Sequence, residues 1–244
     1  MINIDDLKVL VINLKDDHSR RELAKKELEG TSINYSFIEA INGRDFDINR
    51  AIYPKEKVKR LTGYELTKNE LGCFMSHQKC WHIAVKSNSP CLVLEDDFKL
   101  SNSFYESLVF AFQNYRQWDL LRLQALALNE KKSNNVPGKK FSIVSILGDP
   151  LGATAYIVKP SSASKLIMKS KQIFEPLDHY LEHFSRHNIE MRALLPYPVE
   201  SSGVDTTIPN RPYSERSLRG TRKLKRSIFR FLDRKFSSDP WFPK

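Results

Sequence analysis

Hydrophobic and polar residues follow one another in blocks along this chain, and the blocks predict strands and helices in turn. The first apolar run, at residues 8–14, has the length and the β-branched content of a strand. A polar segment with helical spacing follows it and stops at Gly30, and a second strand is predicted at 34–40. The chain therefore opens with a β-α-β unit.

Thr67 and Glu70 mark the start of the next helix. They have the spacing of a capping box, which places the first helical turn near Lys68. Apolar residues follow one side of this helix from about residue 70 to residue 86, and the turn at 87–90 leads into a strand at 91–95. The mixed, charged stretch at 44–64 is predicted to be a long loop.

Strands and helices go on alternating beyond that strand. The pattern predicts further helices over 104–115, 161–169 and 176–187, strands over 119–123, 141–147 and 152–158, and a loop over 129–140. Such alternation is typical of an α/β domain with a largely parallel sheet. The 244 residues can hold one large domain or two small ones, and α/β domains of this size are often single.

Charge divides the chain near residue 210. The formal net charge is +10, and residues 211–244 carry eleven Lys or Arg against three acids, so only +2 belongs to residues 1–210. We expect a folded domain over 1–210 and a basic amphipathic tail over 211–244. The tail favours attachment to an anionic membrane surface. Nucleic acid binding and disorder are the alternatives, and no nucleic acid is expected because stacking aromatics do not interleave on the basic face.

The chain lacks a membrane-spanning pattern. No apolar run approaches the roughly 20 residues that cross a bilayer, and the start MINIDDLKV has acids where a secretory signal is basic. A cytoplasmic protein is therefore expected. The three cysteines, Cys73, Cys80 and Cys91, lack the paired spacing of a zinc site and are expected to be reduced and structural.

Three adjacent acids, Glu95, Asp96 and Asp97, follow the apolar run of the strand at 91–95. In open α/β sheets the ligand crevice lies outside the carboxyl ends of the strands, so these carboxylates are predicted to reach it. They repel one another, and hard oxygen ligands suit Mg²⁺ or Mn²⁺. In an extended chain Glu95 and Asp97 share one side and Asp96 faces the other. The alternative is a solvated turn that caps the next helix.

Three separated segments resemble glycosyltransferase family 25, the bacterial lipooligosaccharide sugar transferases. They are VINLKDDHSRRE at 11–22, LTKNELGCFMSHQKCW at 66–81 and LVLEDDF at 92–98. The middle block keeps the family positions Leu66, Thr67, Glu70, Gly72, Cys73, Ser76, His77 and Trp81. GATAYIVKPSSASKL, PLDHYL and VDTTI are similar to later family segments, so the match runs from about residue 8 to residue 208. Asn69 departs from the small residue usual there.

The resemblance implies a GT-A-type, Rossmann-like fold that binds a UDP-sugar and transfers its hexose with inversion, using Mn²⁺ or Mg²⁺. Members commonly move galactose or glucose onto a growing, lipid-linked lipooligosaccharide or lipopolysaccharide core. Such an acceptor would place the protein on the inner face of the bacterial inner membrane, held by its basic tail. A nucleotidyltransferase, or a non-enzymatic basic lipid- or nucleic-acid-binding protein, is the alternative.

The resemblance suggests separate roles for the acids, as metal ligands or as contacts for the sugar. Asp97 is the first choice as metal ligand, with Asp96 or Glu95 as its partner. Glu95 and Asp96 are alternatively contacts for ribose or sugar hydroxyls. Asp205 is a further candidate ligand, although a lone late Asp is more often a turn residue.

Asp178 is the candidate base that takes the proton from the acceptor hydroxyl. It follows Pro176 at a predicted helix start, so a plain N-terminal cap is the alternative. On the same helix His179, His183 and His187 share one face, which suits either a metal or, as we prefer, solvent.

The remaining candidates lie on the first two predicted helices and at the end of the first strand. Ser76, His77 and Trp81 stand at one-turn spacing and suit a sugar, while a core position is the alternative for Trp81. Arg20 and Arg21 suit a phosphate or ribose, or else the helix surface. Asn13 at the strand end could contact the base or cap the turn.

Overall fold

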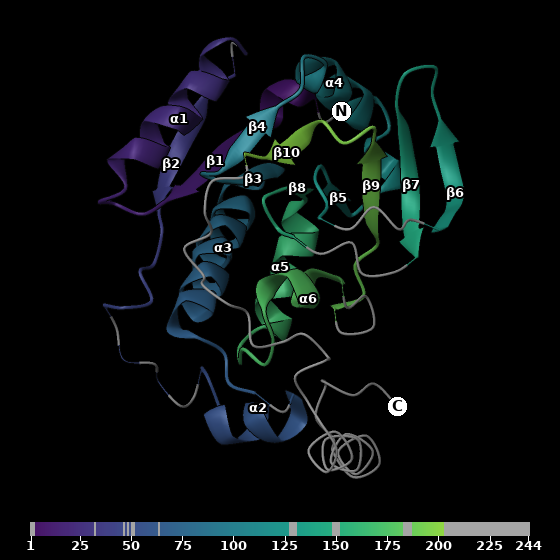
Figure 1. Ribbon diagram of the computed structural model, residues 1–244. Helices are drawn as coiled ribbons and strands as arrows, with labels where there is room; N and C mark the ends of the chain where they lie inside the picture. The colour runs from purple at the N-terminus through teal and green to yellow at the C-terminus, as the bar shows by residue number, and fades with distance from the viewer. Residues whose placement is uncertain are drawn as a thin grey trace.

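The computed structural model describes residues 3–31, 33–45, 47, 49, 52–62, 64–126, 131–147, 152–182 and 187–202. The strands of the main sheet are β1 (Lys8–Asn13), β2 (Tyr35–Glu39), β3 (Cys91–Glu95), β5 (Leu120–Arg122), β6 (Lys131–Pro137), β7 (Ser142–Leu147), β8 (Ala155–Val158) and β9 (Met191–Leu195). They are ordered β2-β1-β3-β8-β5-β9-β7-β6 (Figure 1). A separate antiparallel pair is formed by β4 (Phe98–Leu100) and β10 (Val199–Ser201).

The helices within the described residues are α1 (His18–Glu29), α2 (Lys55–Thr62), α3 (Lys68–Ser87), α4 (Phe104–Gln113), α5 (Pro160–Lys169) and α6 (Leu177–Glu182). Two short 3₁₀ helices, η1 (Ile4–Asp6) and η2 (Tyr115–Gln117), accompany them. No described helix is long and apolar enough to cross a membrane.

The pairings make the sheet mixed but mostly parallel in direction. Strands β2, β1 and β3 run parallel to one another, and β8 is antiparallel to both of its neighbours, β3 and β5. Because β9 is parallel to β5 while β7 runs against both β9 and β6, six of the eight strands point the same way. The predicted α/β class with a largely parallel sheet is confirmed.

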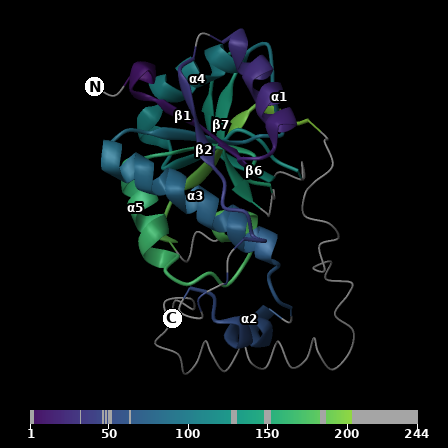
Figure 2. The same cartoon turned by 90° about the vertical axis from the view of Figure 1, so that its left-hand side faces the viewer.

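Alternate residues along the strands face two separate helical layers. Leu10 and Ile12 join the apolar cluster that contains residues of α3, α5 and α6, whereas Val9 and Val11 join the cluster that contains residues of α1 and α4. In Figure 2 the sheet lies between these layers, with α3 and α5 together on one side. The central strands are apolar on both faces because each face is covered.

The start of α3 is capped as the sequence predicts. Thr67 and Glu70 exchange side-chain to backbone hydrogen bonds, and the helix runs from Lys68 to Ser87. A Cβ atom on Gly72 would lie 2.4 Å from the carbonyl oxygen of Ile41, so only glycine lets α3 approach the segment after β2 this closely. This contact brings residues 41–43 alongside the helix that carries the family motif.

Several sequence predictions were wrong. The strand predicted at 152–158 begins only at Ala155, and β4, β9 and β10 were not predicted. Helix α2 occupies part of the predicted loop at 44–64, and α4 ends at Gln113, with the short helix η2 covering 115–117. Strand β6 lies inside the predicted loop at 129–140. Its sequence, KKSNNVP, is polar because β6 is an edge strand that pairs only with β7 among the described strands, so no apolar alternation marks it. The basic tail at 211–244 lies outside the described residues.

Candidate active site

A cavity of about 870 Å³ lies at the carboxyl ends of β1 and β3. The strand ends contribute Asn13 and Glu95, and the turn after β3 contributes Asp96 and Asp97. The other walls come from the segment after β2, the first turns of α3, residues 152–154 and the start of α6. The predicted position of the three acids therefore coincides with a site large enough for a nucleotide-sized ligand.

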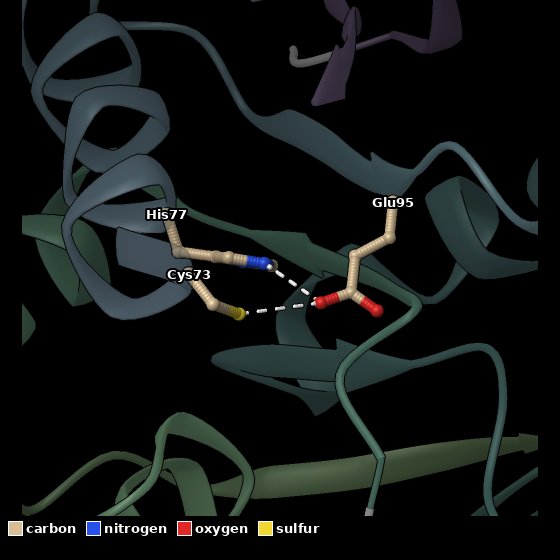
Figure 3. A group of neighbouring side chains, drawn as sticks. All are labelled: Cys73, His77 and Glu95. Atoms are coloured by element: carbon tan, nitrogen blue, oxygen red, sulfur yellow. Dashed lines mark hydrogen bonds and ion pairs between the residues drawn. The ribbon is translucent and has the colours of Figure 1, made fainter. Parts of the chain in front are cut away.

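Glu95 points from the end of β3 toward α3 (Figure 3). Its Oε1 atom accepts hydrogen bonds from Cys73 Sγ at 3.5 Å and from His77 Nε2 at 3.4 Å, and its Oε2 atom accepts one from Thr154 Oγ1 at 3.3 Å. Burial acts to raise the pKa of Glu95, but the hydrogen bonds from His77, Cys73 and Thr154 outweigh it and lower that pKa. The site thus favours an ionised Glu95.

Asp96 faces the opposite way, toward α1. Its Oδ2 atom accepts a hydrogen bond from Asn13 Nδ2 at 2.8 Å, and its Oδ1 atom accepts one from Arg20 Nη1 at 2.9 Å. Burial raises the pKa of Asp96, and these two partners oppose the rise. Asn13 also donates to the carbonyl oxygen of Asp17, so it ties the strand end to the start of α1. Asn13 and Arg20 both line the cavity through this arrangement.

Asp97 lies beyond the end of β3, in the turn before β4, so the strand geometry assumed from the sequence stops at Glu95. Burial, together with the charges of Glu95 and Asp96, raises the pKa of Asp97 to about 6, although Arg20 opposes this. Its Oδ1 atom is buried, and no hydrogen-bond partner for it lies within the described residues. Asp97 therefore has an unmatched acceptor in a negatively charged setting.

Asp178 enters the cavity from the first turn of α6 and is 5% exposed. Its Oδ1 atom accepts a hydrogen bond from the backbone N–H of His179. Of the histidines predicted to share a solvated face, His179 is half-buried, and His187 is buried with Nε2 at 3.2 Å from the carbonyl oxygens of Tyr180 and Leu181. His183, like Asp205, lies outside the described residues.

Three sequence candidates have other surroundings than expected. Trp81 is 0% exposed and packs against Phe74, so its ring cannot stack on a sugar and the core alternative is correct. The Arg21 guanidinium lies 4.0 Å from the centre of the Phe37 ring, and Arg21 is absent from the described lining of the cavity. Ser76 lines the cavity, but its hydroxyl donates to the Gly72 carbonyl and accepts from Ile41 N–H, a structural role.

Sequence reasoning missed the partners that surround Glu95. Cys73 and His77 stand four residues apart on α3, and that spacing alone predicts that their side chains share one helix face. Tyr156 lies in β8 and Thr154 directly precedes that strand. The similarity of the segment at 152–158 to the family covered Tyr156 but assigned it no role, and it did not distinguish Thr154. The antiparallel pairing of β3 with β8 brings the two regions together.

Comparison with known proteins identifies the family. The family model for glycosyltransferase family 25 (LPS biosynthesis protein) matches residues 6–181. Procollagen galactosyltransferase 1-B of Xenopus laevis is 26% identical over 226 residues, which cover 80% of this chain and 36% of that protein. A glycosyltransferase 25 family member of Aedes aegypti is 26% identical over 236 residues, covering 85% and 38%.

Other matches include a protein named as inactive. Inactive glycosyltransferase 25 family member 3 of Homo sapiens is 27% identical over 187 residues, covering 71% of this chain and 31% of that protein. The chain thus spans between 31% and 38% of the length of these three relatives. A solved inositol-1-phosphate CTP transferase from T. maritima aligns with a TM-score of 0.42 and 13% identity over 93% of this chain and 96% of that one. Since the family model covers most of the chain, the protein belongs to glycosyltransferase family 25.

Proposed function

We propose that this protein transfers a hexose, with galactose as the first choice, from a UDP-sugar to a lipooligosaccharide or lipopolysaccharide core. Family membership supports sugar transfer, and the names of the Xenopus relatives support galactose. The observation that carries the proposal is the cavity at the end of β3, where Glu95, Asp96 and Asp97 all line one wall. A GT-A-type assignment of the fold stays a prediction.

The donor set in the cavity fits a hard divalent cation, Mn²⁺ or Mg²⁺. The buried Asp97 Oδ1 atom has no hydrogen-bond partner in the described part of the chain, and its neighbours Glu95 and Asp96 add negative charge. Carboxylate oxygens are the ligands that such ions prefer. We assign Asp97 as the first ligand. Asp96 would be the second through the acceptor positions that its bonds to Asn13 and Arg20 leave open, and Asp205 is a further candidate from the sequence. When bound, the ion would supply positive charge that stabilises the leaving diphosphate.

The other lining residues supply binding and proton transfer. Arg20 lines the cavity and pairs with Asp96, and a guanidinium in such a position would suit the diphosphate or the ribose of the donor. Asn13 lies beside it and suits the base or the ribose. Asp178 would accept the proton of the acceptor hydroxyl while that oxygen bonds to the anomeric carbon, the bond from this carbon to the phosphate oxygen breaks, and UDP leaves. This single displacement inverts the anomeric centre.

The test is transfer by the purified chain from a panel of UDP-sugars to lipooligosaccharide acceptors, with UDP release and product formation as readouts. We expect UDP-galactose to support transfer, EDTA to stop it and added Mn²⁺ to restore it. Release of pyrophosphate from a nucleoside triphosphate would instead identify a nucleotidyltransferase. Absence of transfer from every donor would refute the proposal.

The membrane part of the proposal rests on the sequence of the tail. Its basic residues and its apolar positions at helical spacing suit the surface of an anionic inner membrane, where a lipid-linked acceptor is held. Removing residues 216–244 should abolish binding to liposomes that contain anionic lipid and leave transfer to a soluble acceptor intact. Equal liposome binding by both forms would refute the anchor.

A further inference from the structure

A continuous chain of hydrogen bonds runs from the protein core to Glu95. The Trp81 Nε1 atom lies 2.9 Å from the Tyr156 hydroxyl oxygen, and this oxygen lies 2.8 Å from His77 Nδ1. His77 Nε2 then lies 3.4 Å from Glu95 Oε1. Trp81, Tyr156 and His77 are each at most 2% exposed, so water does not compete for these bonds. The chain joins α3, β8 and β3 at the wall of the cavity.

The donors and acceptors in this series of hydrogen bonds allow only one direction of donation. The indole N–H of Trp81 can only donate, so the Tyr156 oxygen accepts from it. The hydrogen of Tyr156 is then directed to His77 Nδ1, since no other acceptor within hydrogen-bond distance is found among the described residues. A neutral His77 that accepts at Nδ1 carries its hydrogen on Nε2 and donates it to Glu95. With the hydrogen of a neutral His77 on Nδ1 instead, the buried Tyr156 hydrogen would have no acceptor. His77 Nε2 and Glu95 Oε1 would then face each other as two acceptors.

Glu95 keeps acceptor capacity after these contacts. A carboxylate accepts at about four positions. The described residues fill three of them, through Cys73, His77 and Thr154. The Glu95 side chain is 29% exposed and lines the cavity, so the remaining capacity is available to a ligand there. A hydroxyl group is the donor that suits a fixed carboxylate oxygen of this kind.

We propose that His77 and Tyr156 are positioning residues for sugar transfer, which hold Glu95 so that its remaining acceptor position meets a hydroxyl of the bound nucleotide sugar. This inference rests on the proposed function. Neither residue touches the ligand in this arrangement, because His77 and Tyr156 are buried behind Glu95 and are absent from the described lining of the cavity.

A metal ion is the rival occupant of this cluster. The ligand atoms of Cys73, His77 and Glu95 all lie within 4.8 Å of one another, and a Cys-His-carboxylate set suits zinc. A metal bound at His77 Nε2 would require the hydrogen on Nδ1, which reverses the chain and removes the acceptor of the Tyr156 hydrogen. The two arrangements therefore differ in the tautomer of one histidine.

The tautomer can be measured without any enzyme activity. Long-range ¹H–¹⁵N correlation spectra of the full chain labelled at histidine should show His77 with its hydrogen on Nε2, assigned by comparison with His77→Gln. Adding Zn²⁺ should leave this signal unchanged. Hydrogen on Nδ1, or a zinc-dependent change that Cys73→Ser abolishes, would overturn the proposal.

Kinetics and binding test the positioning role itself. Tyr156→Phe should raise the KM for UDP-galactose about tenfold, the equivalent of about 1.4 kcal/mol, with a smaller change in kcat. Tyr180→Phe is the matched control, because Tyr180 is also buried. Its hydroxyl donates to the Leu166 carbonyl oxygen and takes no part in the hydrogen bonds that lead to Glu95. His77→Gln, which can place an amide donor near the Nε2 position, should retain more of the wild-type affinity than His77→Leu. Calorimetry with UDP alone identifies the source of the hydroxyl: weakened UDP binding indicates ribose, and an effect confined to UDP-galactose indicates the sugar.

The outcomes separate the two proposals. Equal effects of Tyr156→Phe and Tyr180→Phe, or no difference between the glutamine and leucine variants of His77, would overturn the positioning role. If wild-type protein gave no transfer and bound no UDP-sugar, the proposed function would fail, and the positioning role, which rests on it, would fail with it. Normal wild-type transfer with unchanged Tyr156→Phe kinetics would refute the positioning role alone.

Discussion

Removing the negative charge of Asp97 should make the metal-free protein more stable at neutral pH. The pKa of Asp97 is raised from the ordinary value of 3.8 to about 6, first by burial and then by the charges of Glu95 and Asp96. The folded protein therefore holds the Asp97 proton more tightly than the unfolded chain does. Stability from this group is present below pH 3.8 and is lost as the pH rises through about 6.

The size of the effect follows from the two pKa values. The difference between 3.8 and about 6 corresponds to about 3 kcal/mol of unfolding free energy once Asp97 is fully ionised. Asp97→Asn keeps the shape of the side chain and cannot ionise, so it should recover up to this amount in EDTA at neutral pH. For a chain of this length, 1 kcal/mol moves the Tm by roughly 2–4 °C, so a rise of about 6–12 °C is the upper expectation.

The assay is thermal unfolding of the wild type and Asp97→Asn in EDTA and in Mn²⁺, at pH 4 and at pH 7.5. The variant should be the more stable protein in EDTA at pH 7.5, and the difference should nearly vanish at pH 4. Manganese at a concentration of 100 Kd should raise the unfolding free energy of the wild type by about 2.7 kcal/mol, and with it the Tm, and should leave the variant unchanged. If the variant is no more stable than the wild type in EDTA, or if manganese stabilises both equally, the account of Asp97 is refuted.

Further substitutions test the catalytic base, the helix contact and the helix cap. Asp178→Asn should lower kcat by about 10²–10⁴-fold with little change in KM, and steady-state rates close to those of the wild type would refute its role as base. Gly72→Ala should destabilise the fold by more than about 2 kcal/mol, because the new methyl group meets the Ile41 carbonyl oxygen at 2.4 Å, and an unchanged Tm would contradict this contact. Thr67→Ala should lower the unfolding free energy by about 1 kcal/mol, because the cap of α3 is lost, and should leave KM unchanged. Chemical unfolding and steady-state kinetics measure the two quantities, and a much larger loss of stability would mean that Thr67 does more than cap α3.

Local sequence signals were sufficient wherever neighbouring residues decide the structure. The capping box at Thr67 predicted the start of α3, and the apolar run before Glu95 predicted a buried strand that delivers carboxylates to a cavity. Alternation along the strand also predicted that Glu95 and Asp96 face opposite sides, as their partners on α3 and α1 confirm. These features depend on spacing within a few residues.

Features that depend on distant pairing were not predictable in the same way. The polar edge strand β6 has no apolar alternation, and among the described strands it pairs with β7, a partner that no signal in its own sequence indicates. The surroundings of Trp81 depend on the antiparallel pairing of β3 with β8, which brings Tyr156 to its indole N–H. A pattern of residue types could not distinguish a ring that stacks on sugar from one that donates a hydrogen bond inside the core.

Helix α3 contacts two separate parts of the cavity wall. Gly72 and Ser76 contact the wall at Ile41 through a close backbone approach and a hydrogen bond, while His77, the residue after Ser76, bonds to Glu95. A shift of this one helix would therefore displace the wall and the carboxylate in step, and the width of the cavity would change together with the direction of its acceptor. We therefore expect substitutions on the buried side of α3 to change two properties together: which donor sugar is preferred, and how tightly it binds.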